Sequence, residues 1–191
     1  MKAIIDATEF KRLVDNTKRF LRDTDNLMSY IYLEVNAEKK QIKATALDGH
    51  MISVEYVKVK ELDTSFKCFI KANIPKITKK DRNVELEVLG ERCFVTVGEN
   101  IAGFIQPEGE YYKVDEMLNN ATKEPPAASI CVDPVLLKKA LESVGSNVFT
   151  RTVKIEIRGK AEPIIIQPTA AQAKENIKLV LPVNMGGGKE R

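Results

Sequence analysis

The chain has 191 residues, of which 43% are hydrophobic, and a net charge of +3, which predicts one or two compact, water-soluble domains. No segment reaches the about 18–20 consecutive apolar residues of a membrane helix, and the apolar stretch within residues 1–6 is too short for a signal-peptide core. We therefore expect a cytoplasmic protein without a membrane partner.

The cysteines and the histidine exclude further classes of protein. An odd number of cysteines without Cys-x-x-Cys spacing argues against a disulfide framework or a zinc site. Each cysteine lies in an apolar, strand-like pattern, so we expect buried, small hydrophobic side chains at Cys68, Cys93 and Cys131. With His50 as the only histidine, we expect no metal and no cofactor.

The first part of the chain predicts one strand, one helix and three further strands. The first strand covers residues 2–5, and the helix covers residues 8–22, where apolar residues recur at helical spacing. Alternation of apolar and polar residues then predicts strands at 29–36, 41–47 and 51–58.

The same order of elements recurs twice more. The second copy begins with a strand at residue 66, continues with a short helix at 71–79 that Pro75 opens, and ends with strands at 83–89, 92–98 and 101–106. The third copy begins with a strand at residue 129, continues with a helix at 135–144 behind Asp133 and Pro134, and ends with strands at 151–158, 162–167 and 177–183. Starts at residues 2, 66 and 129 lie 64 and 63 residues apart. We therefore predict an α+β fold of three βαβββ half-units, with antiparallel sheets and helices on one face.

Positive charge is concentrated in two of the predicted helices. Residues 7–22 carry a net charge of +3 and residues 71–82 carry +4, so the rest of the chain carries −4. Concentrated basic charge on the polar side of a helix is typical of a surface that binds a polyanion, although most charged helix faces are only solvated. The third helix is balanced in charge and does not add to this pattern.

These cations predict contacts with phosphates and none with bases. The sequence has no Trp and no helix-turn-helix pattern, so we expect salt-sensitive binding of duplex DNA that does not depend on base sequence. The predicted DNA-binding residues are Lys11, Arg12, Lys18, Arg19, Arg22, Lys71, Lys76, Lys79 and Lys80.

Motifs for catalysis are not found in the sequence. It has no Gly-x-Ser-x-Gly elbow, no phosphate-binding glycine loop, and no second histidine to accompany His50. Asp48 and Gly49 before it predict a hairpin bend, because Gly tolerates positive φ and Asp favours turns. We therefore expect no enzyme activity.

Several stretches resemble the bacterial DNA polymerase III beta subunit family, the sliding clamps. The stretch "TALDGHMIS" is similar to the family's Thr-Asp-Gly-His-Arg-Leu loop, and "EGEYYKVDEML" is similar to its Glu-Gly-Glu-Tyr-Pro segment. The stretches "VDPVLLKKALESV", "EPIIIQP" and "LVLPVNM" look like the end of the last clamp domain. The resemblance implies a DNA polymerase processivity factor whose helices line a ring around duplex DNA, and whose partners are DNA polymerase and clamp-loader peptides.

The resemblance also implies a hydrophobic peptide pocket between a loop and the C-terminal tail. On this sequence the loop comprises Leu47, Gly49, His50, Met51 and Ile52, and the tail comprises Val180, Leu181, Pro182, Val183, Asn184 and Met185. The alternative is that the tail is only an edge strand of the core. The sequence departs from the family at Met51 and Asn184, where the family has Arg, and at Tyr112 and Asn119, where Pro is expected.

Three half-units predict one complete clamp-like domain and one half-domain. We expect the complete domain at 1–118, a linker at 119–127, the half-domain at 128–185 and a flexible tail at 186–191. The half-domain has an exposed sheet edge, so we expect a homo-oligomer or docking onto the first domain. An alternative function is a clamp-derived, peptide-binding regulator or decoy that does not encircle DNA.

Overall fold

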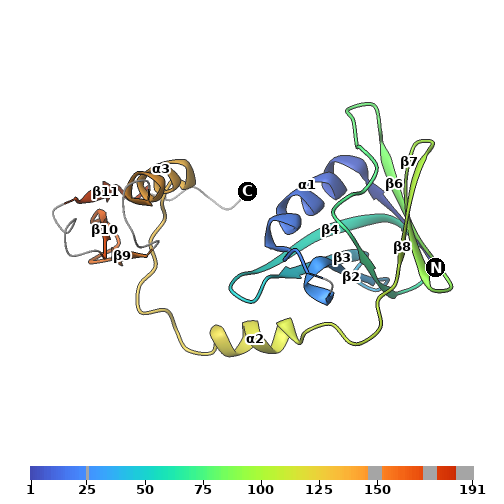
Figure 1. Cartoon of the computed structure of the whole chain (residues 1–191), viewed down its shortest axis with the longest axis horizontal. Coiled ribbons are helices and arrows are strands. Elements are labelled where there is room, and N and C mark those ends of the chain that lie inside the picture. Colours follow the sequence, from blue (N-terminus) through green and yellow to red (C-terminus); the bar gives the residue numbers. More distant parts are fainter. Residues whose placement is uncertain (25, 146–151, 170–175, 184–191) are drawn as a thin grey trace. The chain divides into compact units, whose positions relative to one another are not determined.

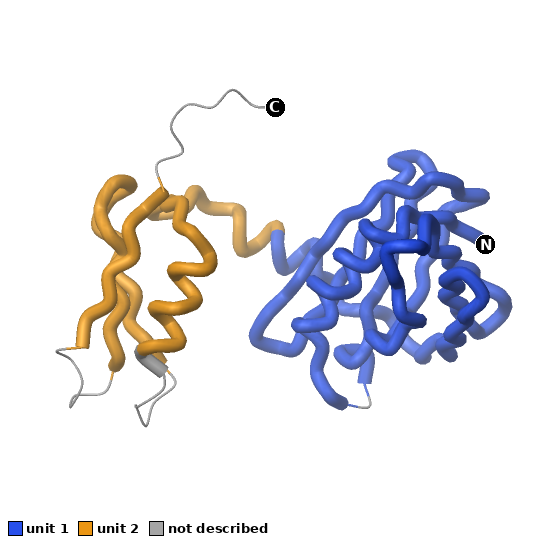
Figure 2. Tube along the Cα trace, turned by 90° about the horizontal axis from the view of Figure 1, so that it is seen from above, with its two compact units in different colours: residues 1–118 blue, residues 119–191 orange. Residues whose placement is uncertain are grey.

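The computed structural model describes residues 1–24, 26–145, 152–169 and 176–183 (Figure 1). The chain divides into two compact units, Met1–Leu118 and Asn119–Arg191 (Figure 2). Residue 151 of a predicted strand, Asn184, Met185 and the predicted tail at 186–191 lie outside the described residues.

The first unit contains eight strands and one long helix. Its elements are β1 (Lys2–Asp6), α1 (Ala7–Thr17), the 3-10 helices η1 (Lys18–Phe20) and η2 (Leu27–Ser29), β2 (Ile31–Asn36), β3 (Gln41–Leu47), β4 (Ile52–Leu62), β5 (Phe66–Ile70), β6 (Asn83–Leu89), β7 (Arg92–Val97) and β8 (Asn100–Ile105). The strands form one antiparallel sheet in the order β5-β2-β3-β4-β1-β6-β7-β8. The predicted α+β fold class with antiparallel sheets is confirmed.

The two halves of this sheet exchange strands symmetrically. β1, the first strand of the first half, pairs with β6, the second strand of the second half. Likewise β5, the first strand of the second half, pairs with β2, the second strand of the first half. In each half of the sheet, the first strand therefore pairs with the second strand of the other half.

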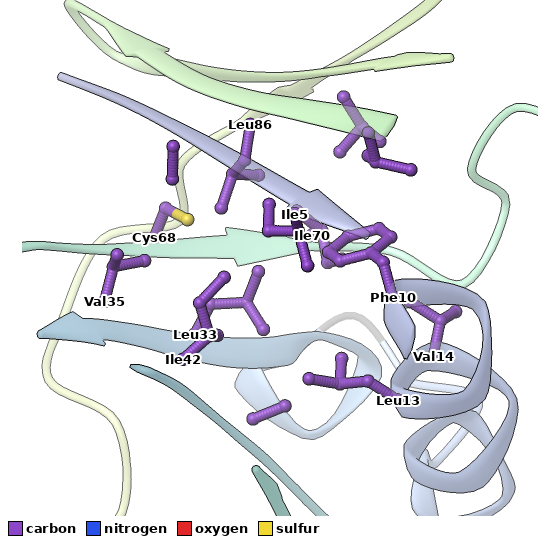
Figure 3. Close-up of a cluster of buried hydrophobic side chains, with 14 of the residues drawn as sticks. Ile5, Phe10, Leu13, Val14, Leu33, Val35, Ile42, Cys68, Ile70 and Leu86 are labelled. Carbon is purple, nitrogen blue, oxygen red and sulfur yellow. The ribbon is translucent and has the colours of Figure 1, made fainter. Parts of the chain in front are cut away.

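Helix α1 begins at a side-chain cap and packs on one face of the sheet (Figure 1). Oδ1 of Asp6 accepts hydrogen bonds from the amides of Thr8 and Glu9, at 2.9 and 3.3 Å, which satisfies two of the amides that lack partners in the first turn. Figure 3 shows Phe10, Leu13 and Val14 against the strands, and Phe10 and Leu13 are fully buried. This face of α1 anchors the core of the unit.

Helix α1 is shorter than the predicted helix at 8–22. It ends at Thr17, whose hydroxyl donates to the carbonyl of Leu13 at 2.6 Å, and the backbone tightens into η1. The backbone is extended by Leu21, so Arg22 lies beyond the helix.

The predicted helix at residues 71–79 is wrong, because this segment forms neither a helix nor a strand. Pro75 disfavours a helical conformation for Ile74, and β-branched side chains lower the helix propensity of Ile77 and Thr78. Asp81 then accepts hydrogen bonds from the amide and hydroxyl of Thr78, each at 2.7 Å, which forms a turn. Ile77 is buried in the core, so the segment covers the sheet without forming a helix.

The second unit has α3 (Pro134–Gly145) over a three-stranded sheet in the order β11-β10-β9, with β9 (Val153–Glu156), β10 (Ile164–Pro168) and β11 (Lys178–Val180). Its core contains Ile164, Ile166 and Val180. The predicted strand at 129–132 forms only one bridge, between Val132 and Pro182.

A helix that the sequence did not predict, α2 (Val114–Ala121), extends across the expected boundary at residue 118. Residues 119–121 of the predicted linker are therefore helical. The predicted burial of cysteines is confirmed for Cys68 and Cys93 and is wrong for Cys131, which is exposed. Cys131 points away from the core because Ile130 and Val132, on either side of it, pack inward.

Candidate nucleic-acid interface and partner-binding segments

Two lysines on the solvent side of α1 share one carboxylate. Lys18 binds Asp15 at 2.5 Å, and Lys11 binds the other oxygen of the same carboxylate. Hydrogen bonds from Lys11 and then from Lys18 lower the pKa of Asp15, so it is an anion at neutral pH. The group therefore carries one net positive charge.

Arg12 is the most strongly engaged of the predicted DNA-binding residues. It donates to Glu9 at 3.0 Å, to Glu55 on β4 at 2.6 Å, and to the carbonyl of Tyr56 at 3.1 Å. The hydrogen bond with Glu9, followed by that with Glu55, raises the pKa of Arg12. Because two acids surround one guanidinium, Arg12 fastens the helix to the sheet and adds no net positive charge.

The irregular segment after β5 brings a third lysine to the helix. A cavity of about 260 Å³ lies between the two elements, and its lining residues are Lys11, Val14, Asp15, Lys18, Ala72, Ile74, Pro75, Lys76 and Ile77. Lys76 is exposed, and no ion pair is found for it among the described residues. The structure thus gathers Lys11, Lys18 and Lys76 on the α1 side of the sheet, which we call the lysine cluster.

The remaining predicted DNA-binding residues do not belong to the lysine cluster. Arg19 lies on η1, and Arg22 follows it in extended chain. Lys79 and Lys80 are exposed in the turn that Thr78 and Asp81 close. The ammonium group of Lys71 lies 5.0 Å from the centroid of the Tyr30 ring, a cation–π contact.

The predicted peptide-binding loop is a tight bend held by one carboxylate. Oδ1 of Asp48 accepts hydrogen bonds from the amides of His50 and Met51, at 2.8 and 2.7 Å. These bonds lower the pKa of Asp48, and Gly49 has φ of 94°, a conformation that favours glycine. Leu47 is buried, whereas Met51 and Ile52 are 48% and 36% exposed.

The predicted peptide-binding tail belongs to the second unit. Val180 is buried in the core of that unit, whereas Leu181 and Val183 are 68% and 46% exposed. A pocket of about 400 Å³ is lined by Ser129, Ile130, Cys131, Lys160, Ala161, Pro182 and Val183. Because the loop and the tail belong to different units, the structure describes each of them separately.

A cluster on the outer face of the sheet, formed by Tyr32, Glu34, Lys43, Tyr111 and Asp115, was not predicted from the sequence. Its members come from two distant parts of the chain, and sequence patterns show only short-range relations. Tyr32 and Tyr111 stack with ring centroids 4.7 Å apart, although 79 residues separate them in the chain. Beside them Lys43 binds Asp115 at 2.6 Å and Glu34 at 3.0 Å; burial opposes its charge, but these bonds outweigh burial and raise its pKa. The cluster attaches residues 111–115 to the face of the sheet opposite α1.

Neither a metal site nor a membrane-spanning helix is found among the described residues. In this part of the chain no group of three or more His, Cys, Asp or Glu side chains could hold a metal ion. None of the described helices is both long enough and apolar enough to cross a membrane.

Comparison with solved structures defines the class of fold: it is that of the DNA polymerase III beta subunits, the bacterial sliding clamps. The sliding clamp from Bacillus subtilis shares 16% identity at a TM-score of 0.74, and the beta subunit from Pseudomonas aeruginosa shares 17% at 0.74. The Helicobacter pylori beta clamp bound to a DNA ligase peptide shares 16% identity at a TM-score of 0.57. These matches cover 95% of this chain and 49%, 51% and 56% of the respective clamp chains.

The chain therefore spans about half the length of the clamps that it resembles. No family model and no curated protein sequence matches it. At this level of identity, the likeness establishes the fold.

Proposed function

We propose that the chain is a sliding-clamp-like DNA polymerase processivity factor. It is not an enzyme, acts in the cytoplasm as a homo-oligomer, contacts duplex DNA without reading its sequence, and binds peptides of replication proteins. The observation that carries this proposal is the lysine cluster, which lies on the helix side of a sliding-clamp fold.

The chemistry of the lysine cluster suits a phosphate backbone. Lysine is a flexible point charge that contacts phosphates without base specificity. The Lys11, Asp15 and Lys18 group contributes one net positive charge, and Lys76 contributes a second. On this basis we expect the cluster to neutralise about two phosphates, each adding about 0.9 to the slope of log affinity against log salt.

The exposed apolar side chains of the loop and the tail support peptide binding. Met51 and Leu181 each expose about half or more of their side chains to water. A short apolar peptide would cover such side chains, and the flexible thioether of Met51 would adapt to its shape. The comparison with the Helicobacter pylori clamp, which was solved with a DNA ligase peptide, supports the same role.

The DNA contact is tested by the variant Lys11→Gln, Lys18→Gln, Lys76→Gln. Anisotropy of a labelled duplex should show weaker binding, with a salt slope shallower by about 1.8, or two contacts of 0.9 each. The matched control is Lys39→Gln, Lys58→Gln, Lys67→Gln, which removes three exposed lysines elsewhere on the first unit. Equal effects of the two variants would remove the DNA-facing assignment.

Peptide binding without salt-sensitive DNA binding by the unmodified protein would instead favour a regulator or decoy.

A further inference from the structure

Within its described residues, the second unit repeats the helix cap and the strand pairing of the first half of the first unit. Asp133 caps α3 by accepting hydrogen bonds from the amides of Val135 and Leu136, at 2.7 and 3.4 Å, as Asp6 caps α1. If Asp133 is set equivalent to Asp6, Ile130 and Val132 take the places of Ala3 and Ile5. Both pairs of side chains pack inward.

Strand pairing follows the same equivalence. Three cross-strand pairs of the first unit are Ile5 with Val59, Ile42 with Val57, and Leu33 with Ala44. Their counterparts in the second unit are Val132 with Pro182, Ile164 with Val180, and Ile155 with Ile166. Segment 129–132 therefore corresponds to β1, and β9 corresponds to β2.

In the first unit, both of these strands receive a partner from the other half of the sheet. The outer edge of β1 pairs with β6, and the outer edge of β2 pairs with β5. The same half also covers the inward side chains of β2, so Leu33 is 0% and Val35 3% exposed. A βαβββ half is thus completed by another half related to it by an approximate two-fold axis.

In the second unit, the corresponding edges are open. Among the described residues, β9 pairs only with β10, and segment 129–132 pairs only along the edge that faces Pro182 and Val183. Ile155 and Ile157, which occupy the places of Leu33 and Val35, are 48% and 43% exposed. By analogy with the first unit, a second βαβββ half would complete this sheet. Its first strand would pair with β9, and its second strand would pair with segment 129–132.

We infer that two copies of this chain associate through their second units, with segment 129–132 of each copy pairing antiparallel with β9 of the other. The second unit carries both of the edges that have to meet, so a two-fold axis satisfies both pairings at once. In the first unit, Ala3 lies opposite Leu86 and Ile5 opposite Val84. The corresponding register places Ile130 opposite Ile155 of the second copy, and Val132 opposite Val153.

This register places Cys131 directly opposite Lys154 of the second copy. Both side chains lie on the face away from α3, because Ile130, Val132 and Val153 pack inward. Residues directly opposite in an antiparallel pair have Cα atoms about 4.5–5.5 Å apart, within disulfide range. Within one chain, residues 131 and 154 are three strands apart, about 14 Å at about 4.8 Å per strand, which is too far.

The test is oxidation of the full-length Lys154→Cys variant, followed by a non-reducing gel. We expect a covalent dimer that reductant dissolves and that Cys131→Ser abolishes. The matched control is Leu179→Cys, an exposed position on β11 that the proposed pairing leaves away from Cys131. Equal cross-linking of the two variants, or none in Lys154→Cys, would overturn the proposal.

Light scattering of the full-length protein gives a second readout. We expect twice the chain mass of 21.4 kDa or a multiple of that dimer. Ile155→Lys should at least halve the observed mass, whereas Leu179→Lys should leave it unchanged. A protein that is already monomeric without substitution would overturn the proposal. The inference rests on the homo-oligomer of the proposed function, but these readouts involve neither DNA nor peptides, so their failure would leave the proposed DNA and peptide binding untouched.

Discussion

The most informative single substitution is Asp15→Asn, because it should strengthen DNA binding. In the folded protein one carboxylate holds both Lys11 and Lys18. Asparagine keeps the shape of the side chain but removes its charge, so the net charge of this group rises from +1 to +2. The free energy of unfolding should fall by less than about 1 kcal/mol, because the two ion pairs are partly exposed to solvent.

The magnitude follows from counterion release. One additional phosphate contact should steepen the slope of log affinity against log salt by about 0.9. Raising salt from about 50 to 200 mM should then weaken the variant about 3.5-fold more than the unsubstituted protein. At low salt the variant should bind a labelled duplex more tightly in a fluorescence anisotropy titration.

The matched control is Asp115→Asn, which raises the net charge by the same amount on the face opposite α1. Asp115 also binds a lysine, Lys43, at 2.6 Å. If the lysine cluster contacts DNA, only Asp15→Asn should change the slope. Equal slopes for the two variants would show that net charge alone matters and that the lysine cluster makes no particular contact with DNA.

Three further predictions concern peptides and stability. Replacing Leu181 and Val183 with Ser should abolish binding of replication-protein peptides in a calorimetric titration, and undiminished binding would place the pocket elsewhere. Phe10→Ala should lower the free energy of unfolding by about 3–5 kcal/mol in urea, because the ring is fully buried; a cost below about 1 kcal/mol would contradict that packing. Asp6→Ala should cost about 1 kcal/mol at pH 7. The hydrogen bond from Lys60 and those from the helix amides lower the pKa of Asp6, so its contribution is present above about pH 4 and is lost as pH falls through the folded-state pKa. The stability difference between Asp6→Ala and the unsubstituted protein should therefore shrink in acid, and a constant difference would argue against the capping carboxylate.

Local patterns predicted most elements of the first unit. Alternation placed β3 at residues 41–47 and β6 at residues 83–89, with the bounds that the structure shows. The helix at 71–79 was predicted because Pro is common at the first position of helices. In the structure the bond from the amide of Thr78 to Asp81 forms a turn instead, and Ile77 packs into the core from an irregular segment.

The sequence predicted which residues supply the positive charge of the site, but it did not predict how these residues are arranged in space. The sequence shows that positive charge gathers near Lys11 and Lys76, but it does not show which acids neutralise it. Glu55 reaches Arg12 across 43 residues, and that pairing depends on β4 lying beside α1. The repeated order of elements already made β9 the counterpart of β2, but the residue-by-residue match of these two strands depends on cross-strand register, which the sequence does not show.

The central claim is that the protein holds duplex DNA by its phosphates. The most direct test is to measure the affinity of the full-length protein for several duplexes of equal length and unrelated sequence over a range of salt concentrations. We expect one common affinity at each salt concentration, and we expect log affinity to fall linearly with log salt at one common slope. Affinities that differ with base sequence, or that do not change with salt, would contradict it.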